Sequence, residues 1–197
     1  MAIVDTNDEL LQERVCEIVA SAVPKLAECG LNLMSPVAIS FSNKLDHSSG
    51  VHFGIYHLGK NRIELLDPKT FEQAFRRSET WTAVPLAEHF EAVVVHEFAH
   101  ALVDQNAAIQ RACIADDEYI AYAMQIESLS ESTRSVLLAE VGASPPTSTQ
   151  EINSLVLGFS PADFAVRSWL HFAEPENGCA FVEKIIQGEV TFFFLPE

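Results

Sequence analysis

Apolar and polar residues recur along the first part of the chain with two different periods. Between residues 8 and 28, apolar residues return every three or four positions, as they do on one face of an amphipathic helix. Three later stretches alternate with a period of two and predict β-strands: 36–41, 51–58 and 62–66. A turn at 59–61 joins the last two strands as a hairpin, and a short helix near 69–77 follows.

The rest of the chain is predicted to be mainly helical. Residues 93–102 are apolar almost all round, apart from one polar motif, which is typical of a buried helix. A second helix is predicted at 117–129, with a helical pattern continuing to about 141. The segment 142–149 is rich in glycine, proline, serine and threonine and is predicted to be a loop. Two helices and an apolar end complete the chain: 161–174, 178–187 and 190–195.

These elements predict an α+β fold with an N-terminal helix, a small mixed β-sheet and two central helices. A chain of 197 residues has the length of one domain. Since 48% of its residues are apolar, its core is large enough to fold without disulfide bonds or structural metal ions. Within that domain, residues 1–141 hold the sheet and the central helices. Residues 151–197 are expected to form a helical C-terminal lobe.

The polar motif in the buried helix is His96-Glu97-Phe98-Ala99-His100. Because positions i and i+4 of a helix lie one above the other, the imidazoles of His96 and His100 can bind one metal ion together. Glu97 lies about a quarter turn round the helix, within reach of a water molecule that the metal makes acidic. Burying these three side chains without partners is costly, and a metal ion removes that cost. The motif therefore predicts a Zn²⁺ site with Glu97 as general base.

A zinc site of this kind needs a third ligand. A third histidine at the metzincin spacing is excluded, because Val103 and Asn106 occupy the required positions. Glu118 follows the motif by enough residues for one helix to end and the next to return antiparallel, and we predict it as the ligand. Asp116 and Asp117 are alternatives, although both suit the capping of free N–H groups at the start of the helix. A site without a third ligand is the remaining alternative.

The motif and the downstream glutamate resemble the gluzincin class of zincin metallopeptidases, in which a Glu on the next helix completes HExxH. The resemblance covers mainly residues 84–128, and it is nearer to small bacterial zincin-like proteins with the arrangement "HExxH … EYxAY". Thermolysin-type gluzincins often carry Asn before the ligand and Asp four residues after it, where this chain has Asp117 and Tyr122. The resemblance implies a zincin-like fold, a bound Zn²⁺ and hydrolysis of peptide bonds in a peptide or protein substrate.

The resemblance also implies an edge strand beside the cleft, with which a peptide substrate pairs as an added strand. The stretch 54–66 resembles this strand, although an ordinary hairpin explains its pattern equally well. The alternative hypothesis is a zincin-fold protein that binds zinc and a partner without turnover. Glu97 argues against it, because a structural zinc site has no use for a base beside the metal.

Several side chains are candidates for assisting the reaction. Tyr122 shares a helix face with Glu118, so it can hydrogen-bond a metal-binding histidine or the developing oxyanion. Gluzincins often supply a histidine from the C-terminal lobe, which makes His171 a second candidate, although packing in an aromatic helix also explains it. Tyr119 is a third. His89 lies seven residues before the motif on roughly the same face, and we expect it at the exposed start of the helix.

Composition narrows the range of partners. A formal net charge of −16 argues against binding to nucleic acids and to anionic membrane surfaces, since both would repel the protein. The first residues lack the basic and apolar regions of a signal peptide, so we expect either a cytosolic protein or an exported one whose signal has been removed. An even number of cysteines slightly favours export, and four allow three pairings: Cys16, Cys29, Cys113 and Cys179.

Overall fold

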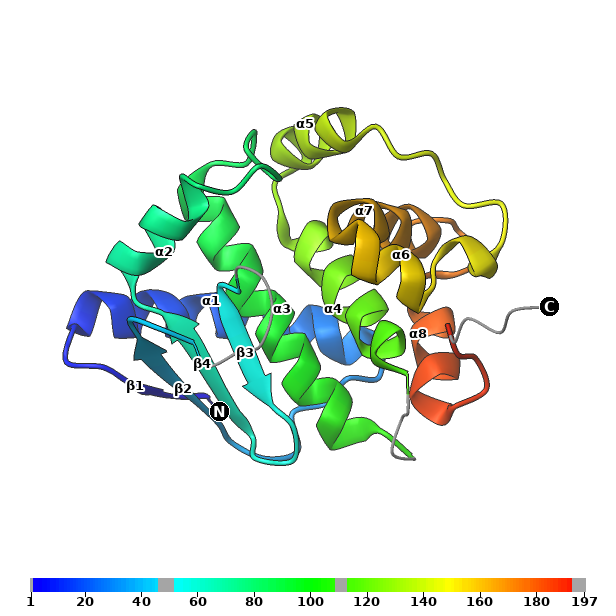
Figure 1. Cartoon of the computed structure of the whole chain (residues 1–197). Coiled ribbons are helices and arrows are strands. Elements are labelled where there is room, and N and C mark those ends of the chain that lie inside the picture. The colour runs from blue at the N-terminus through cyan, green and yellow to red at the C-terminus, as the bar shows by residue number, and fades with distance from the viewer. Residues whose placement is uncertain (1, 46–51, 109–112, 193–197) are drawn as a thin grey trace.

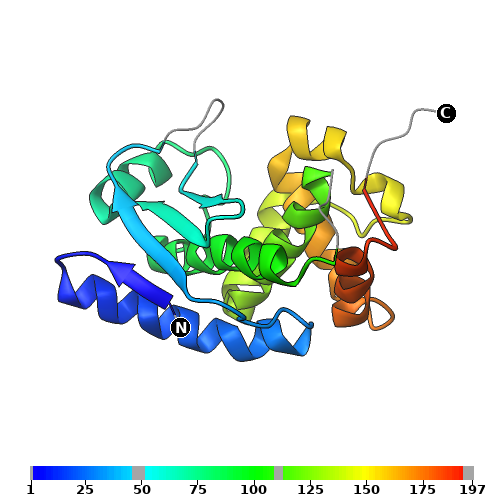
Figure 2. The same cartoon turned by 90° about the horizontal axis from the view of Figure 1, so that it is seen from below.

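The computed structural model describes residues 2–45, 52–108 and 113–192, and these ranges contain a small mixed β-sheet and eight α-helices (Figure 1). The sheet lies on one side of the molecule and the helices of the second half of the chain lie on the other. The long helix α3 (Leu86–Asn106) runs between them, as Figure 2 shows from below. The fold is therefore mixed α/β, in agreement with the combination of sheet and helices that the apolar pattern predicts.

The sheet has four strands in the order β1-β2-β4-β3. β1 (Ala2–Asp5) and β4 (Arg62–Leu66) pair in parallel with β2 (Val37–Ser42), whereas β3 (Gly54–His57) pairs antiparallel with β4. β3 and β4 form the predicted hairpin, and β3 is one of the two edge strands, β1 being the other. β1 is not among the predicted strands, because four residues are too few to show an alternating pattern.

One face of the sheet is buried and the other is more open. Along β2 and β4, alternate side chains are fully buried: Val37, Ile39, Ile63 and Leu65. The residues between them are mostly exposed or half-buried, as in sheets that are covered on one side only. α1 (Glu9–Glu28) and α3 contribute to the core that covers the buried face, and they also pack against each other.

Aspartate side chains mark where the first two helices begin. Asp8 accepts hydrogen bonds from two backbone N–H groups at the start of α1. Asp67 does the same at the start of α2 (Pro68–Phe75). Proline suits the first position of α2 because its missing N–H would have no partner in the helix. These local signals explain why both helices begin within a residue of their predicted starts.

α3 and α4 (Ile114–Ser128) lie side by side at the centre of the molecule (Figure 1). Neither helix has a side-chain cap at its N-terminus, so packing rather than a local signal stabilises them. Ala99 on α3 and Ala121 on α4 are fully buried, and their small side chains permit a close approach of the helix backbones. The central helix is buried almost all round, as its composition predicts.

The C-terminal part of the chain is helical, as expected, and packs onto the central helices. Its α-helices are α5 (Glu131–Val141), α6 (Ser154–Phe159), α7 (Pro161–Phe172) and α8 (Gly178–Gln187). α7 lies along α4, and α8 contributes to the same main core as the sheet. A disulfide joins Cys29, at the end of α1, to Cys179 in α8, whereas Cys16 and Cys113 are free thiols. The C-terminal helices are therefore linked covalently to the N-terminal helix.

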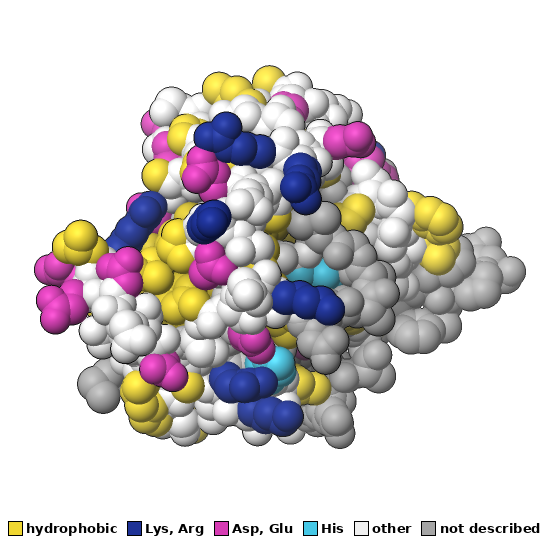
Figure 3. Space-filling view, turned by 60° about the vertical axis from the view of Figure 1, so that its left-hand side comes forward, with side chains coloured by type: hydrophobic (Ala, Val, Ile, Leu, Met, Phe, Trp, Pro, Cys, Tyr) yellow, Lys and Arg dark blue, Asp and Glu magenta, His cyan; other side chains and the backbone are white. Residues whose placement is uncertain are grey.

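The described surface carries both signs of charge. On the face seen in Figure 3, acidic and basic side chains are interspersed around small apolar areas. No described helix combines the length and the apolar character needed to cross a lipid bilayer.

Candidate metal centre

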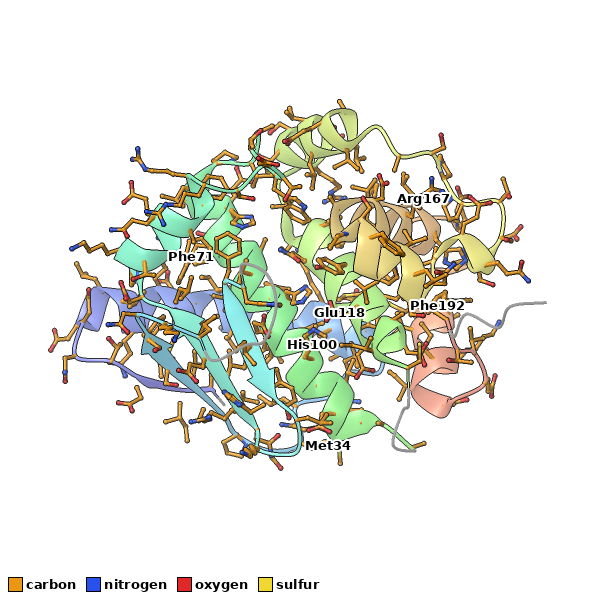
Figure 4. All side chains as sticks on the ribbon, viewed as in Figure 1. Met34, Phe71, His100, Glu118, Arg167 and Phe192 are labelled. Atoms are coloured by element: carbon orange, nitrogen blue, oxygen red, sulfur yellow. A yellow bond between two sulfur atoms is a disulfide. The ribbon has the colours of Figure 1, made fainter. Side chains whose placement is uncertain are left out.

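Two helices bring three potential metal ligands together at the centre of the molecule. His96 and His100 lie one turn apart on α3, and Glu118 faces them from the second turn of α4, as the labelled His100 and Glu118 show in Figure 4. The Nε2 atoms of the two histidines are 3.1 Å apart. Carboxylate oxygens of Glu118 lie 3.5 Å from Nε2 of His96 and 3.6 Å from Nε2 of His100. Among the described residues, no other group of histidine, cysteine or acidic side chains converges in this way.

The separations between the ligand groups suit a tetrahedral zinc ion: Oε2 of Glu118 is the oxygen near His96, and Oε1 is the oxygen near His100. Zinc binds imidazole nitrogen and carboxylate oxygen at about 2.0–2.2 Å, so two ligand atoms of a tetrahedron lie about 3.3 Å apart. The observed separations of 3.1, 3.5 and 3.6 Å lie on either side of this value, so binding needs only small side-chain adjustments. Three protein ligands leave a fourth position open, which is typical of a catalytic zinc site rather than a structural one.

Burial changes the proton affinity of the groups at this centre. Burial and the nearby charge of Glu118 raise the pKa of Glu97 to about 8, opposed by a backbone hydrogen bond from Tyr56. Burial and the charge of Asp117 likewise raise the pKa of Glu118 to about 8. Burial holds the pKa of His96 well below its usual range. A divalent cation would stabilise both carboxylates in their ionised form and favour neutral imidazole, so this set of residues fits a metal ion.

Glu97 is held against the edge strand of the sheet. Its side chain is buried, and a Cβ at Gly54 of β3 would lie 2.6 Å from Cγ of Glu97 and 2.8 Å from Cδ2 of Leu65. Carbon atoms do not approach this closely, so only glycine fits at this position without displacing its neighbours. The close approach places β3 directly beside Glu97. No local feature of the sequence distinguishes Gly54 from a turn glycine, and the sequence analysis did not identify it.

Two side chains of α4 lie next to His96. The ring of Tyr122 stands edge-on to that of His96, with the centroids 4.7 Å apart, so the two predicted site residues are in contact. Gln125 is buried, and neither its Oε1 nor Nδ1 of His96 has a hydrogen-bond partner. Burial and the charge of His100 lower the pKa of His96, and the nearby Gln125 side chain opposes this. Because an imidazole N–H and an amide oxygen are complementary, Gln125 is suited to orient His96 during metal binding.

Asp116 and Asp117, the alternative ligands, lie in the first turn of α4, at the helix start where they are predicted. The residue at the cap position is Cys113 and no side chain caps the helix, so the interpretation of the two aspartates as caps is wrong. Asp116 is buried and accepts a hydrogen bond of 2.7 Å from the backbone N–H of Phe192, which anchors the last described residues (Figure 4). The structure brings Glu118, rather than Asp116, to the histidines.

His171 and Tyr119 do not line the cavity that opens beside His96 and Glu97 and is described below. Nδ1 of His171 is 2.8 Å from the hydroxyl oxygen of Tyr119, and its ring packs against Phe181 with the centroids 4.6 Å apart. Tyr119 is fully buried. Two of the three candidates for an oxyanion donor are thus paired with each other in an aromatic cluster, and Tyr122 is the candidate that lines the cavity.

A cavity of about 280 Å³ opens beside His96 and Glu97. Side chains of α3 and α4 line it together with residues 52–54, the segment before α3 and the start of α7, the last two through Ser78, Thr80, Trp81, Pro161 and Ala162. His89 lines this cavity and is only 5% exposed, so the expectation that it lies at an exposed helix start is wrong. Aromatic residues from the preceding segments cover this end of the helix, which periodicity within the helix does not reveal.

The chain belongs to the DUF6639 family, a family of unknown function, whose family model matches residues 2–194. The match extends over the sheet, the central helices and the C-terminal helices, and is not confined to the motif. No curated protein and no solved structure matches the chain.

Proposed function

We propose that this protein is a zinc-dependent hydrolase of the gluzincin type that acts on peptide bonds. The observation that carries the proposal is the convergence of His96, His100 and Glu118, with separations that suit zinc, beside the buried carboxyl of Glu97. A structural site needs no such base, whereas a hydrolytic one does.

Each residue has a defined task in the proposed reaction. His96 and His100 would hold zinc through Nε2 and Glu118 through its carboxylate. When bound, zinc makes a water molecule more acidic and polarises a carbonyl group. Glu97 accepts a proton from the attacking water as the C–O bond forms, and passes it to the leaving amine as the C–N bond breaks. Tyr122, which lines the cavity, is the proposed hydrogen-bond donor to the developing oxyanion.

The position of β3 supports a peptide as substrate. β3 pairs with β4 on one side only, which leaves its other edge unpaired within the described sheet. An extended peptide can add to such an edge through backbone hydrogen bonds, with little demand on its sequence. Gly54 brings this strand into contact with Glu97, so a peptide bond paired with β3 would lie near the proposed base.

The arrangement of the elements supports a zincin-like fold in the same proposal. An antiparallel edge strand lies beside the motif helix, and the helix that returns along it supplies the third ligand. One residue differs from the pattern of thermolysin-type gluzincins. This chain has Tyr122 four residues after Glu118, where those proteins often have Asp. In this chain Gln125 offers the polar group beside His96 instead.

Glu97→Gln tests the proposed reaction. The amide cannot accept the proton, so we expect hydrolysis of a mixed peptide library to fall about 10²- to 10⁴-fold. The zinc affinity should stay within a few-fold of the parent, because Glu97 is not a ligand. The readout is mass spectrometry of the cleaved library beside elemental analysis of zinc. If the variant cleaves as well as the parent, Glu97 is not the base.

The alternative is a zincin-fold protein that binds zinc and a partner without turnover. One observation favours it: His171, the candidate oxyanion donor from the C-terminal helices, is engaged by Tyr119 outside the cavity. In that case the parent protein would bind one zinc ion and yet cleave no peptide of the library, with or without Glu97.

A further inference from the structure

A second histidine environment lies at the other end of the same cavity. His89 is 5% exposed, and neither of its ring nitrogens has a hydrogen-bond partner. It lines the cavity together with His96, seven residues further along α3. Seven residues of helix span about 10 Å, so His89 is separated from the metal ligands by about the length of three extended residues.

Aromatic rings surround this histidine. Phe53 and Phe75 lie with their ring centroids 4.9 Å from that of His89, Phe71 at 5.6 Å and Trp81 at 5.7 Å. Figure 4 shows the labelled Phe71 well away from His100 and Glu118. A phenylalanine would complete such a cluster without any polar atom, whereas a buried imidazole without a partner is costly. Packing alone therefore does not account for a histidine at position 89.

Trp81, whose ring packs against His89, has a strained backbone conformation. Trp81 has φ +63°, a left-handed backbone conformation that is uncommon for a bulky residue. The carboxylate of Glu140 fixes the next two residues: it accepts hydrogen bonds from the backbone N–H of Thr82 at 2.9 Å and of Ala83 at 3.1 Å. Trp81 is nevertheless 6% exposed and lines the cavity, so its ring is fixed as part of the wall.

We propose that His89, Trp81 and Phe53 form a recognition subsite for an uncharged aromatic side chain that carries a hydrogen-bonding group, such as the phenol of tyrosine. The subsite rests on the proposed function in one respect: it lies in the same cavity as Glu97, so the side chain that it binds belongs to the substrate. Given its separation from the metal ligands, that side chain lies within about three residues of the bond to be cleaved.

The chemistry of the lining decides which group fits. Burial lowers the pKa of His89 to about 4, so at neutral pH its imidazole is uncharged, with one donor and one acceptor. A phenol hydroxyl can pair with either nitrogen, and a half-turn of the imidazole about its Cβ–Cγ bond exchanges nitrogen and carbon positions towards the cavity. None of the described residues that line the cavity is Lys or Arg, so an anionic group would find no counter-charge.

The test uses p-cresol as the probe, with toluene as the matched probe that lacks the hydroxyl. Binding to the zinc-supplemented protein is followed by NMR through the indole N–H signals of Trp81 and Trp169. Trp169 does not line the cavity and serves as an internal control. We expect p-cresol to shift the Trp81 signal selectively and to bind about tenfold more tightly than toluene, the factor that one well-placed hydrogen bond supplies.

In His89→Phe the two probes should bind with equal affinity, and His89→Leu serves as a second apolar variant if the larger ring disturbs folding. His171→Phe is the matched control, because His171 is also a histidine in an aromatic cluster but lies outside the cavity. It should leave the tenfold ratio unchanged. Equal binding of the two probes by the parent, no shift of the Trp81 signal, or a ratio unchanged in both His89 variants would each overturn the proposal. Because binding is measured rather than turnover, these results stand even if the protein cleaves no peptide.

Discussion

One face of α3 carries histidines in contrasting surroundings at its middle and near its start. Towards the middle of α3, His96 and His100 converge with Glu118 of α4 at separations of 3.1 to 3.6 Å. Two turns earlier, aromatic rings enclose His89. They come from Phe53, directly before β3, from α2 and from the segment before α3. The residue type and the helix are the same, and the neighbouring elements differ.

The element that packs against a histidine therefore decides what that histidine can do. At His96 and His100, α4 supplies a carboxylate, so the three side chains form a group of donors that suits a divalent cation. At His89, the neighbours supply apolar rings, so the imidazole retains unused hydrogen-bonding capacity that a ligand can satisfy. His89 and His96 line one cavity, so the proposed recognition residue and a candidate metal ligand face the same space.

Removing each histidine in turn should have very different effects on zinc binding. His96→Ala should weaken zinc binding about 100-fold or more, since each of three ligands carries about 3 kcal/mol of a total near 10 kcal/mol. His89→Phe should leave the zinc affinity within about twofold, because this residue lies about 10 Å from the ligands. Competition with a chromogenic chelator measures both. If His89→Phe weakens zinc binding as strongly as His96→Ala, the two histidine environments are not distinct.

The pH dependence of the free energy of unfolding tests whether His89 is buried as a neutral imidazole. The pKa of His89 is about 4 in the folded protein, below the value of about 6.5 in an unfolded chain. The unfolded state therefore binds more protons between these values, so this contribution to stability is complete above about pH 6.5 and is lost as the pH falls towards 4.

His89→Phe removes this contribution. Its free energy of unfolding relative to the parent should rise by up to about 3 kcal/mol between pH 7 and pH 4. Urea denaturation at several pH values, with a chelator present so that metal release does not intervene, measures the difference. A constant difference across this range would mean that His89 is not buried in its neutral form.

The smallest expected effect concerns Gln125 at the candidate metal centre. Gln125→Ala removes the side-chain amide that interacts with His96, and loss of such an orienting partner typically weakens metal binding about 10- to 100-fold. Gln125→Glu keeps an acceptor at this position and should restore most of the affinity. If both variants bind zinc like the parent, Gln125 has no part in orienting His96.

Much of the architecture could be predicted from the sequence, because strong periodic signals and local caps specify it. The hairpin of β3 and β4, the buried helix α3 and the helices that begin after Asp8 and Asp67 follow from such signals. β1 and α6 could not be predicted, since four and six residues are too short to show a period.

Some features of the candidate site could likewise be predicted from the sequence, and others could not. The approach of His96, His100 and Glu118 follows from spacing within one helix and from one antiparallel return. The contact of Gly54 with Glu97 and the burial of His89 depend on how strands and loops fold over α3, which no local pattern contains. The pairing of His171 with Tyr119 also depends on tertiary packing, because the two residues come from different helices.

The zinc content of the purified protein, measured by elemental analysis beside Glu118→Ala, tests the central claim most directly. We predict one zinc ion per chain in the parent after zinc has been added and the excess removed by dialysis. The variant should retain little or none under the same conditions. No zinc in the parent would contradict the account, and His96 and His100 would then be core histidines. One zinc ion retained by Glu118→Ala would contradict the assignment of Glu118 as the third ligand.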